Sequence, residues 1–163
     1  MDIPGNDQQD SLLWRRAAAA LIDASILAAA TLPALGRAPE AAMLAPATLV
    51  LTGGLAMFYR VVFEGSPAAA TPGKLLTGLR VVHRGGERLS FAAAALRSWP
   101  WWLTGAVAGI APSGIPVAAL LSLVAVAAIP LSATRQGLHD RMAGTRVVVR
   151  RHGHHPPGTD KGA

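Results

Sequence analysis

The sequence predicts an all-α membrane protein: a four-helix transmembrane bundle, made of two helical hairpins, with a small cytoplasmic cap that contains β-structure. Three observations predict this fold. Hydrophobic residues make up 52% of the 163 residues and charged residues only 15%, whereas soluble domains have about 25% charged residues. Charged residues are absent over long stretches, the longest being 98–134. Basic residues gather in alternate segments between these apolar stretches.

Four apolar stretches predict the membrane spans, at residues 15–35, 42–63, 98–112 and 115–133. A span needs about 20 apolar residues, so the uncharged segment 98–134 is too long for one helix. Prolines and glycines at 111–116 predict the turn that divides it. A cleaved signal peptide is an alternative for the first stretch, but Asp23 in its middle disfavours one. A soluble helical bundle is another, but an uncharged segment of this length lacks the polar face that soluble helices present to water.

The basic residues predict how the spans are oriented. Arg15 and Arg16 stand at the start of the first span, the loop 64–97 and the tail from Arg135 onward are cationic, and the turn between spans three and four has no charge. The positive-inside rule therefore places both termini and the loop 64–97 in the cytoplasm. There the arginines would meet anionic lipid headgroups. This use of the net charge of +6 argues against nucleic-acid binding.

The predicted transmembrane domain occupies 14–150, between tails at 1–13 and 151–163 that we expect to be disordered. Within the central loop, Leu79–Val82 is strand-like, and Ser90 is placed to cap a helix that runs through the alanines to Arg97. The segment 74–82 is similar to 140–148, at an offset of 66 residues, and each copy follows a pair of spans. Two interpretations are open: a structural repeat whose two strands pair into the cap, or chance similarity.

Asp23 is the most informative side chain in the apolar stretches. A carboxylate near the centre of a span costs about 2.5–3.5 kcal/mol, so it should face a partner or a wet cavity. Arg16, Arg60 and Arg97 are expected at the same end of the bundle, which makes a charge cluster with Asp23 geometrically reasonable. The cluster is interpreted either as a cation or proton site or as a structural ion pair that fixes helix packing.

Other motifs in the sequence carry less chemistry. Gly105 and Gly109 form a GxxxG pattern, which predicts close helix packing either within the chain or between copies in a homo-oligomer. The chain has no cysteine, no Gly-x-Ser-x-Gly motif and no glycine-rich phosphate loop. The three histidines near the C-terminus lack supporting carboxylates. We therefore expect no enzymatic activity, no cofactor and no metal site.

The segment from Arg16 to Asp23 resembles the first-helix signature of the RDD family of bacterial membrane proteins, which is named for an arginine and two aspartates. The segment 71–82, with Pro72, Gly73 and Lys74, is similar to that family's central loop, and 137–145 is similar to its terminal segment. The resemblance implies that Asp140 is the second aspartate and joins the candidate charge cluster. It also implies location in the bacterial plasma membrane. Transport of unidentified ligands has been proposed for the family, and cation/proton antiport is linked to some members.

Two functions follow as hypotheses. The first is a transporter, or a transporter subunit, for a cation or a small polar solute, which requires Asp23 to face a polar cavity. The alternative is a non-catalytic membrane adaptor that binds anionic lipid or a protein partner through its basic cytoplasmic loop, with Asp23 neutralised by arginine inside the bundle.

Overall fold

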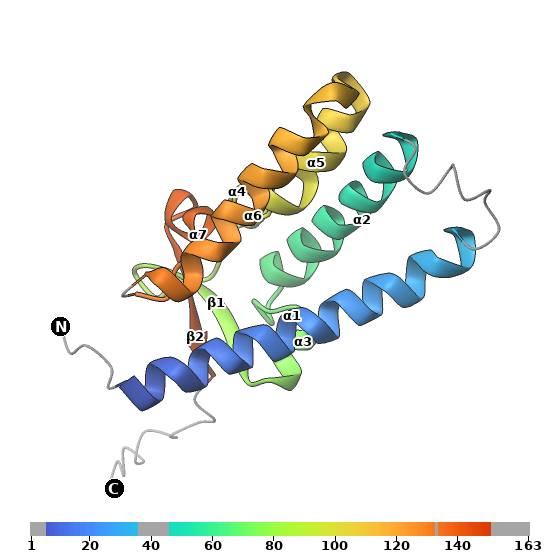
Figure 1. Cartoon of the computed structure of the whole chain (residues 1–163). Coiled ribbons are helices and arrows are strands. Elements are labelled where there is room, and N and C mark those ends of the chain that lie inside the picture. Colours follow the sequence, from blue (N-terminus) through green and yellow to red (C-terminus); the bar gives the residue numbers. More distant parts are fainter. Residues whose placement is uncertain (1–5, 36–45, 133, 151–163) are drawn as a thin grey trace, which may run out of the picture.

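The computed structural model describes residues 6–35, 46–132 and 134–150, and it is mostly helical with one two-stranded sheet (Figure 1). The longer helices are α1 (Asn6–Leu35), α2 (Pro46–Gly65), α5 (Trp99–Ile110) and α6 (Ile115–Leu131). The short elements are α3 (Pro72–Leu76), β1 (Leu79–His83), α4 (Phe91–Arg97), the 3-10 turn η2 (Pro112–Gly114), α7 (Leu138–Met142) and β2 (Thr145–Val149). Among the described residues, the segments 46–65 and 112–131 are long and apolar enough to cross a membrane.

Helix α1 is longer than the predicted first span, because it begins at Asn6. Residues 6–13, which we expected within a disordered tail, form its first turns. They are helical because they have something to pack against: Leu12 contacts the buried core of the cap, and the carboxylate of Asp10 lies 3.3 Å from the guanidinium of Arg135. The rest of the predicted tails, at 1–5 and 151–163, lies outside the described residues.

Helix α5 packs closely against both α2 and α6. Gly105 permits the approach to α2, since a Cβ atom at this position would lie 2.5 Å from the carbonyl oxygen of Leu49. At Gly105 the GxxxG pattern therefore serves packing within the chain. Between α5 and α6, the predicted turn contains η2 and joins the two helices into a hairpin. Both helices are slightly shorter than the predicted spans 98–112 and 115–133.

The cap is built on the two strands, which pair antiparallel with Val81 opposite Val147. One face of this sheet is buried against Ala19 of α1 and Ala94 of α4, and together these residues form the hydrophobic core of the cap. Arginines of both strands are exposed on the other face. The predicted helix cap is confirmed: the Ser90 hydroxyl accepts a hydrogen bond from the third amide of the α4 segment at 3.2 Å.

The similarity at an offset of 66 residues reflects a structural repeat. The two apolar segments 46–65 and 112–131 stand at this offset, and each is followed by a short helix and a strand. Equivalent residues adopt positive φ in both copies: Ala69 (50°) and Arg135 (51°), then Gly78 (71°) and Gly144 (64°). A left-handed conformation at a non-glycine residue is uncommon, so its recurrence at equivalent positions argues against chance similarity.

The strands of the two copies also meet symmetrically. Val81 lies opposite its own equivalent, Val147. The Arg84 amide donates a hydrogen bond to the carbonyl oxygen of Gly144, in the second copy, at 3.0 Å. Equivalently, the Arg150 amide donates to the carbonyl oxygen of Gly78, in the first copy, at 2.7 Å. A local two-fold axis therefore passes through the sheet. The prediction that the two strands pair is confirmed.

Candidate functional site

Asp23 projects from α1 into contact with α2 and the cap, and only 1% of its surface is exposed. Its carboxylate accepts three hydrogen bonds: from the Tyr59 hydroxyl at 2.8 Å, the Thr71 hydroxyl at 2.6 Å and the Gly73 amide at 2.8 Å. All three donors are neutral. Hydrogen bonds to the charged form stabilise a buried carboxylate without a counter-ion. Asp23 therefore ties α1 to α2 and α3.

The expected cluster of Asp23 with Arg16, Arg60 and Arg97 is present, since all four side chains line one cavity, but none of these arginines forms an ion pair with Asp23. Arg16 does lie on the same helix, but side chains on a helix tilt toward its N-terminus. Arg16 consequently reaches into the cap, where its guanidinium lies 2.9 Å from the second oxygen of Asp140.

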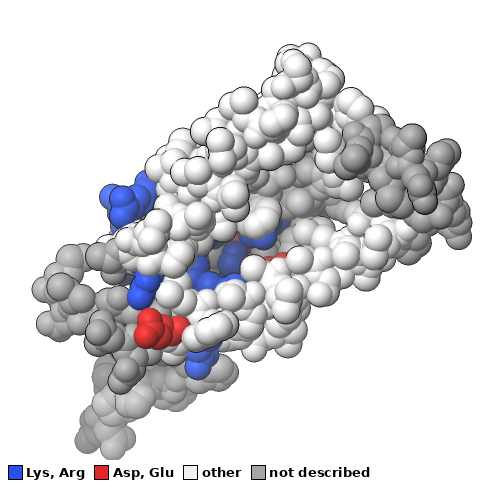
Figure 2. Space-filling model, viewed as in Figure 1, with Lys and Arg blue, Asp and Glu red and all other residues white. Residues whose placement is uncertain are grey.

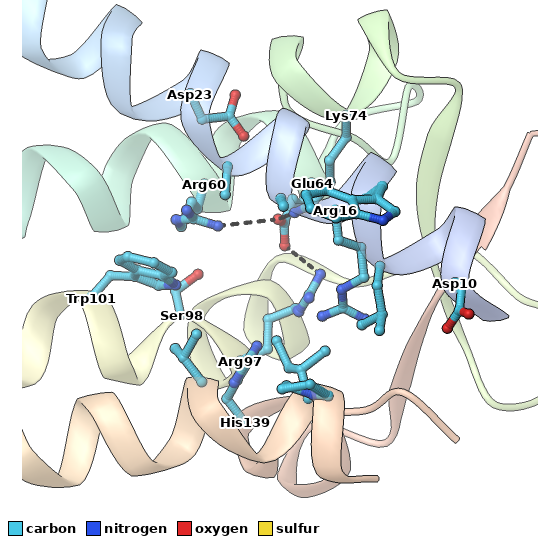
Figure 3. A pocket seen from close by; sticks show the side chains of 17 residues that line it. Asp10, Arg16, Asp23, Arg60, Glu64, Lys74, Arg97, Ser98, Trp101 and His139 are labelled. Atoms are coloured by element: carbon cyan, nitrogen blue, oxygen red, sulfur yellow. Dashed lines mark hydrogen bonds and ion pairs between the residues drawn. The ribbon is translucent and has the colours of Figure 1, made fainter. Parts of the chain in front are cut away.

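The remaining predicted charges form a buried network that links five elements. Arg97 of α4 is its centre: it contacts Glu64 of α2 at 2.8 Å and Asp140 of α7 at 2.5 Å. Asp140 forms a second ion pair with Arg16 of α1, and Glu64 forms a second ion pair with Lys74 of α3. Figure 3 shows Glu64 between Arg60 and Arg97. Predicted residues Arg16, Arg97 and Asp140 are thus brought together, although around a carboxylate that sequence reasoning missed.

Glu64 was missed because it was assigned to the start of the loop 64–97. It is instead the penultimate residue of α2 and is 1% exposed. One available signal was its position four residues after Arg60, where side chains on a helix are neighbours. A second was its place at the end of an apolar stretch.

The predicted loop motif Pro72, Gly73 and Lys74 opens α3, with proline in the first turn, where its missing amide costs nothing. Gly73 is buried against α1: a Cβ atom would overlap the carbonyl oxygen of Ala19 and lie 2.8 Å from Oδ1 of Asp23. Lys74 turns the other way, into the network. The motif therefore sets both the α1 contact and one ion pair.

Arg60 is the cation with the weakest pairing in the site. Its closest carboxylate oxygen, on Glu64, is 4.0 Å away, and its side chain is 11% exposed. The guanidinium stacks over the Trp101 ring, 4.0 Å from the centroid, and its buried Nε has no hydrogen-bond partner. The site as a whole holds four cations and three carboxylates, a net charge of +1, from Arg16, Arg60, Lys74, Arg97, Asp23, Glu64 and Asp140.

A cavity of about 520 Å³ lies between α1 and the other helices, and residues of this charged site line it together with apolar side chains. Figure 2 shows a hollow with blue and red atoms inside it and white surface around it. Its apolar wall includes Leu13 and Ala20 of α1 and Val126 and Ile129 of α6. Such a volume lies within the range of about 300–1,000 Å³ that is typical of small-molecule sites. In the part of the chain that the structure describes, no group of three metal-ligating side chains is found.

The cap residues of the network are charged near neutral pH. Burial lowers the pKa of Lys74 to about 8, although Glu64 opposes the shift. Burial would also lower the pKa of Arg97, but Glu64 and then Asp140 outweigh it, so that this pKa is raised. Burial would raise the pKa of Asp140, but Arg97 and then Arg16 hold it well below its usual range.

His139 gives the protein a pH dependence that can be measured. Burial lowers its pKa from 6.5 to about 4; Asp140 opposes the shift, and Arg97 and Arg16 add to it. Between these values the unfolded chain binds the proton and the folded protein does not, so stability falls as pH falls. From pH 7.5 to pH 5 we expect a loss of about 2 kcal/mol in the free energy of unfolding.

The measurement is equilibrium unfolding in detergent at both pH values, compared with His139→Gln, which cannot titrate. Between pH 7.5 and pH 5, the free energy of unfolding of the variant should fall by about 2 kcal/mol less than that of the wild type. Asp140 does not interfere, because its lowered pKa confines its contribution to lower pH. An equal loss in both proteins would show that His139 is protonated in the fold.

Comparison with protein families decides the classification. A model of the RDD family matches residues 11–144 of the chain. The chain belongs to the RDD family. The resemblance inferred from its motifs is thereby confirmed, and the protein is a membrane-associated member. Of the three residues that the RDD resemblance singled out, Arg16 and Asp140 pair with each other and Asp23 holds the α1–α3 contact. No curated protein and no solved structure matches the chain.

Proposed function

We propose that the protein is a multi-pass protein of the bacterial plasma membrane in which four helices lie in the bilayer as two hairpins. Helices α2 and α6 supply two spans of sufficient length. The part of α1 from Ala17 onward, about 29 Å at 1.5 Å per residue, supplies a third. Helix α5, packed between α2 and α6, is the fourth and is about 18 Å long on the same basis. The arginines of the cap favour a cytoplasmic location for it and for both termini.

Within this topology, we propose that the protein is a transporter or a transporter subunit, and that its solute binds in the cavity beside α1. The observation that carries this proposal is the cavity itself, which buried charged groups and apolar side chains line together. Ionisable groups inside a membrane protein are costly, and they mark solute pathways when they line a cavity. Assembly as a homo-oligomer stays a prediction.

The charges favour a small polar or anionic solute over a cation. Each carboxylate of the site already has short contacts: Asp23 with three neutral donors, Glu64 and Asp140 with two cations each. Arg60 is the cation left with a weak partner. An arriving cation would have to displace an existing ion pair, whereas an anion would find Arg60 available.

The adaptor hypothesis keeps one observation in its favour. The exposed face of the cap carries arginines at equivalent positions of the two repeats: Arg80 and Arg146, then Arg84 and Arg150. Such a patch would attract anionic lipid or an acidic partner. The adaptor hypothesis predicts that substitutions on this exposed face impair function, whereas substitutions in the cavity do not.

The experiment is flux in proteoliposomes, with sodium, protons, chloride and inorganic phosphate as the tested solutes. We expect an anion to move faster than in empty liposomes, and Arg60→Gln to reduce its flux at least tenfold. Arg80→Gln, on the exposed face of the cap, is the matched control and should retain full flux. Asp23→Asn tests the cation version: sodium or proton flux that this variant abolishes would reverse the choice of solute. No flux by folded protein would overturn the transporter proposal and favour the adaptor.

A further inference from the structure

The exposed face of the cap sheet carries its arginines in a regular line. Four successive rows across the strand pair hold one arginine each, alternately on the β2 side and the β1 side: Arg150, Arg80, Arg146 and Arg84. The residue opposite each arginine is a valine or a glycine. All four arginines are exposed, and we call them the arginine ladder. Alternate residues of a strand share a face and stand about 7 Å apart, so the ladder is about 20 Å long.

The ladder has no negative partner within the described fold. Among the residues that the structure describes, no carboxylate forms an ion pair with any of the four arginines. Successive arginines leave the backbone about 8 Å apart, which is about one Debye length at physiological ionic strength, so their charges repel one another. The buried Arg97, by contrast, contacts two carboxylates. A ligand with several negative groups would relieve the repulsion within the ladder.

The spacing of the ladder matches that of an extended acidic polypeptide. In such a chain, alternate side chains also point to one side at intervals of about 7 Å. Aspartates or glutamates at every second position would therefore each meet one arginine of the ladder. Arginine binds a carboxylate through two parallel hydrogen bonds, which makes each of these contacts specific in its geometry.

Two other polyanions fit the ladder less well. Sites for single-stranded nucleic acid combine cations with aromatic side chains on which the bases stack, and β1 and β2 contain no phenylalanine, tyrosine or tryptophan. Elements that bind a bilayer surface insert exposed apolar side chains beside their basic residues. Between the arginines of the ladder, Val82 is only 6% exposed and Val148 is half-buried. The ladder therefore favours an acidic polypeptide.

We propose that the arginine ladder binds an extended acidic segment of a cytoplasmic protein, with carboxylates at alternate positions of that segment. The proposal takes its compartment from the topology proposed above, but it does not involve the solute cavity. The two-fold axis of the cap exchanges the two halves of the ladder, so that Arg80 takes the place of Arg146. The segment meets the same arrangement in either direction, and these two arginines contribute equally to its affinity.

The experiment is fluorescence anisotropy with the full chain in a neutral detergent and labelled peptides of eight residues. One peptide alternates glutamate and threonine, and the other has the same composition with its four glutamates in one block. We expect the alternating peptide to bind roughly tenfold more tightly, because only its carboxylates match the ladder. Arg80→Gln and Arg146→Gln should each weaken its binding by roughly tenfold, and by the same factor. The matched control is Arg141→Gln, which removes one exposed arginine of α7 and should bind as the wild type does.

Four results would overturn the proposal. Equal affinity for the two peptides would show that spacing is not recognised, and unchanged affinity of folded Arg80→Gln and Arg146→Gln would place the peptide elsewhere. Tighter binding of an oligothymidine with four phosphates, or of phosphatidylglycerol, than of the alternating peptide would assign the ladder to nucleic acid or to lipid. Failure of the transporter proposal is distinguishable: peptide binding without solute flux supports the ladder alone, and solute flux without peptide binding supports transport alone.

Discussion

Arg97→Gln should reduce the free energy of unfolding by roughly 3–5 kcal/mol, the usual cost of removing one partner from a buried ion pair. Arg97 is 4% exposed and bridges Glu64 and Asp140 with the two arms of its guanidinium. Glutamine is too short to contact both, so each carboxylate would keep a single cation. Because these carboxylates come from α2 and α7, we expect the cap to separate from the long helices.

The measurement is equilibrium unfolding in mixed detergent, followed by circular dichroism. Arg97→Lys keeps the positive charge but lacks the two-armed guanidinium that contacts both carboxylates. Its free energy of unfolding should therefore lie between those of the wild type and Arg97→Gln. Arg146→Gln, on the exposed face of β2, is the control and should change stability by no more than about 0.5 kcal/mol. If Arg97→Gln were as mild as this control, the network would contribute nothing to the fold.

Gly73→Ala should have the second-largest effect, a loss of roughly 1–3 kcal/mol or more, as expected for overpacking. The added Cβ would overlap backbone of α1 at Ala19, which cannot rotate away as a flexible side chain would. Helix α3 would have to move, and the hydrogen bond from the Gly73 amide to Asp23 would be lost. The contact between α3 and α1 should therefore be weaker.

Hydrogen exchange tests this local effect together with the free energy of unfolding. Amides of α1 around Asp23 should exchange faster in Gly73→Ala than in the wild type. The control is Gly54→Ala, in the middle of α2, where a Cβ atom would meet nothing within 4 Å. This variant should be neutral or slightly more stable. Equal exchange in both variants would contradict the close α1–α3 contact.

Local sequence signals predicted the local structure well. The serine before an alanine run identified α4 through its cap at Ser90, and the pair of similar segments predicted the two strands that pair as β1 and β2. Both signals act over a few residues, through backbone hydrogen bonds and side-chain alternation. The first turns of α1 were mispredicted because their polar composition resembles a tail, whereas in the fold Leu12 contacts the core of the cap and Asp10 pairs with Arg135.

The charged site was predicted in its location but not in its pairing. Sequence reasoning placed Asp23 with the arginines, because opposite charges at one end of a bundle are expected to pair. The structure gives Asp23 three neutral donors and gives the arginines to Glu64 and Asp140. Which charges pair depends on distances between elements that are far apart in the chain, and no spacing within one segment encodes them.

The sequence by itself determined the apolar character, the family resemblance and the similarity between the segments 74–82 and 140–148. These follow from composition and from patterns over short stretches of chain. Only the tertiary structure decided that the repeats meet about a two-fold axis, that Arg97 joins two carboxylates, and that a cavity lies where α1 does not pack against α6. These features are contacts between distant segments, and they depend on how the whole chain packs.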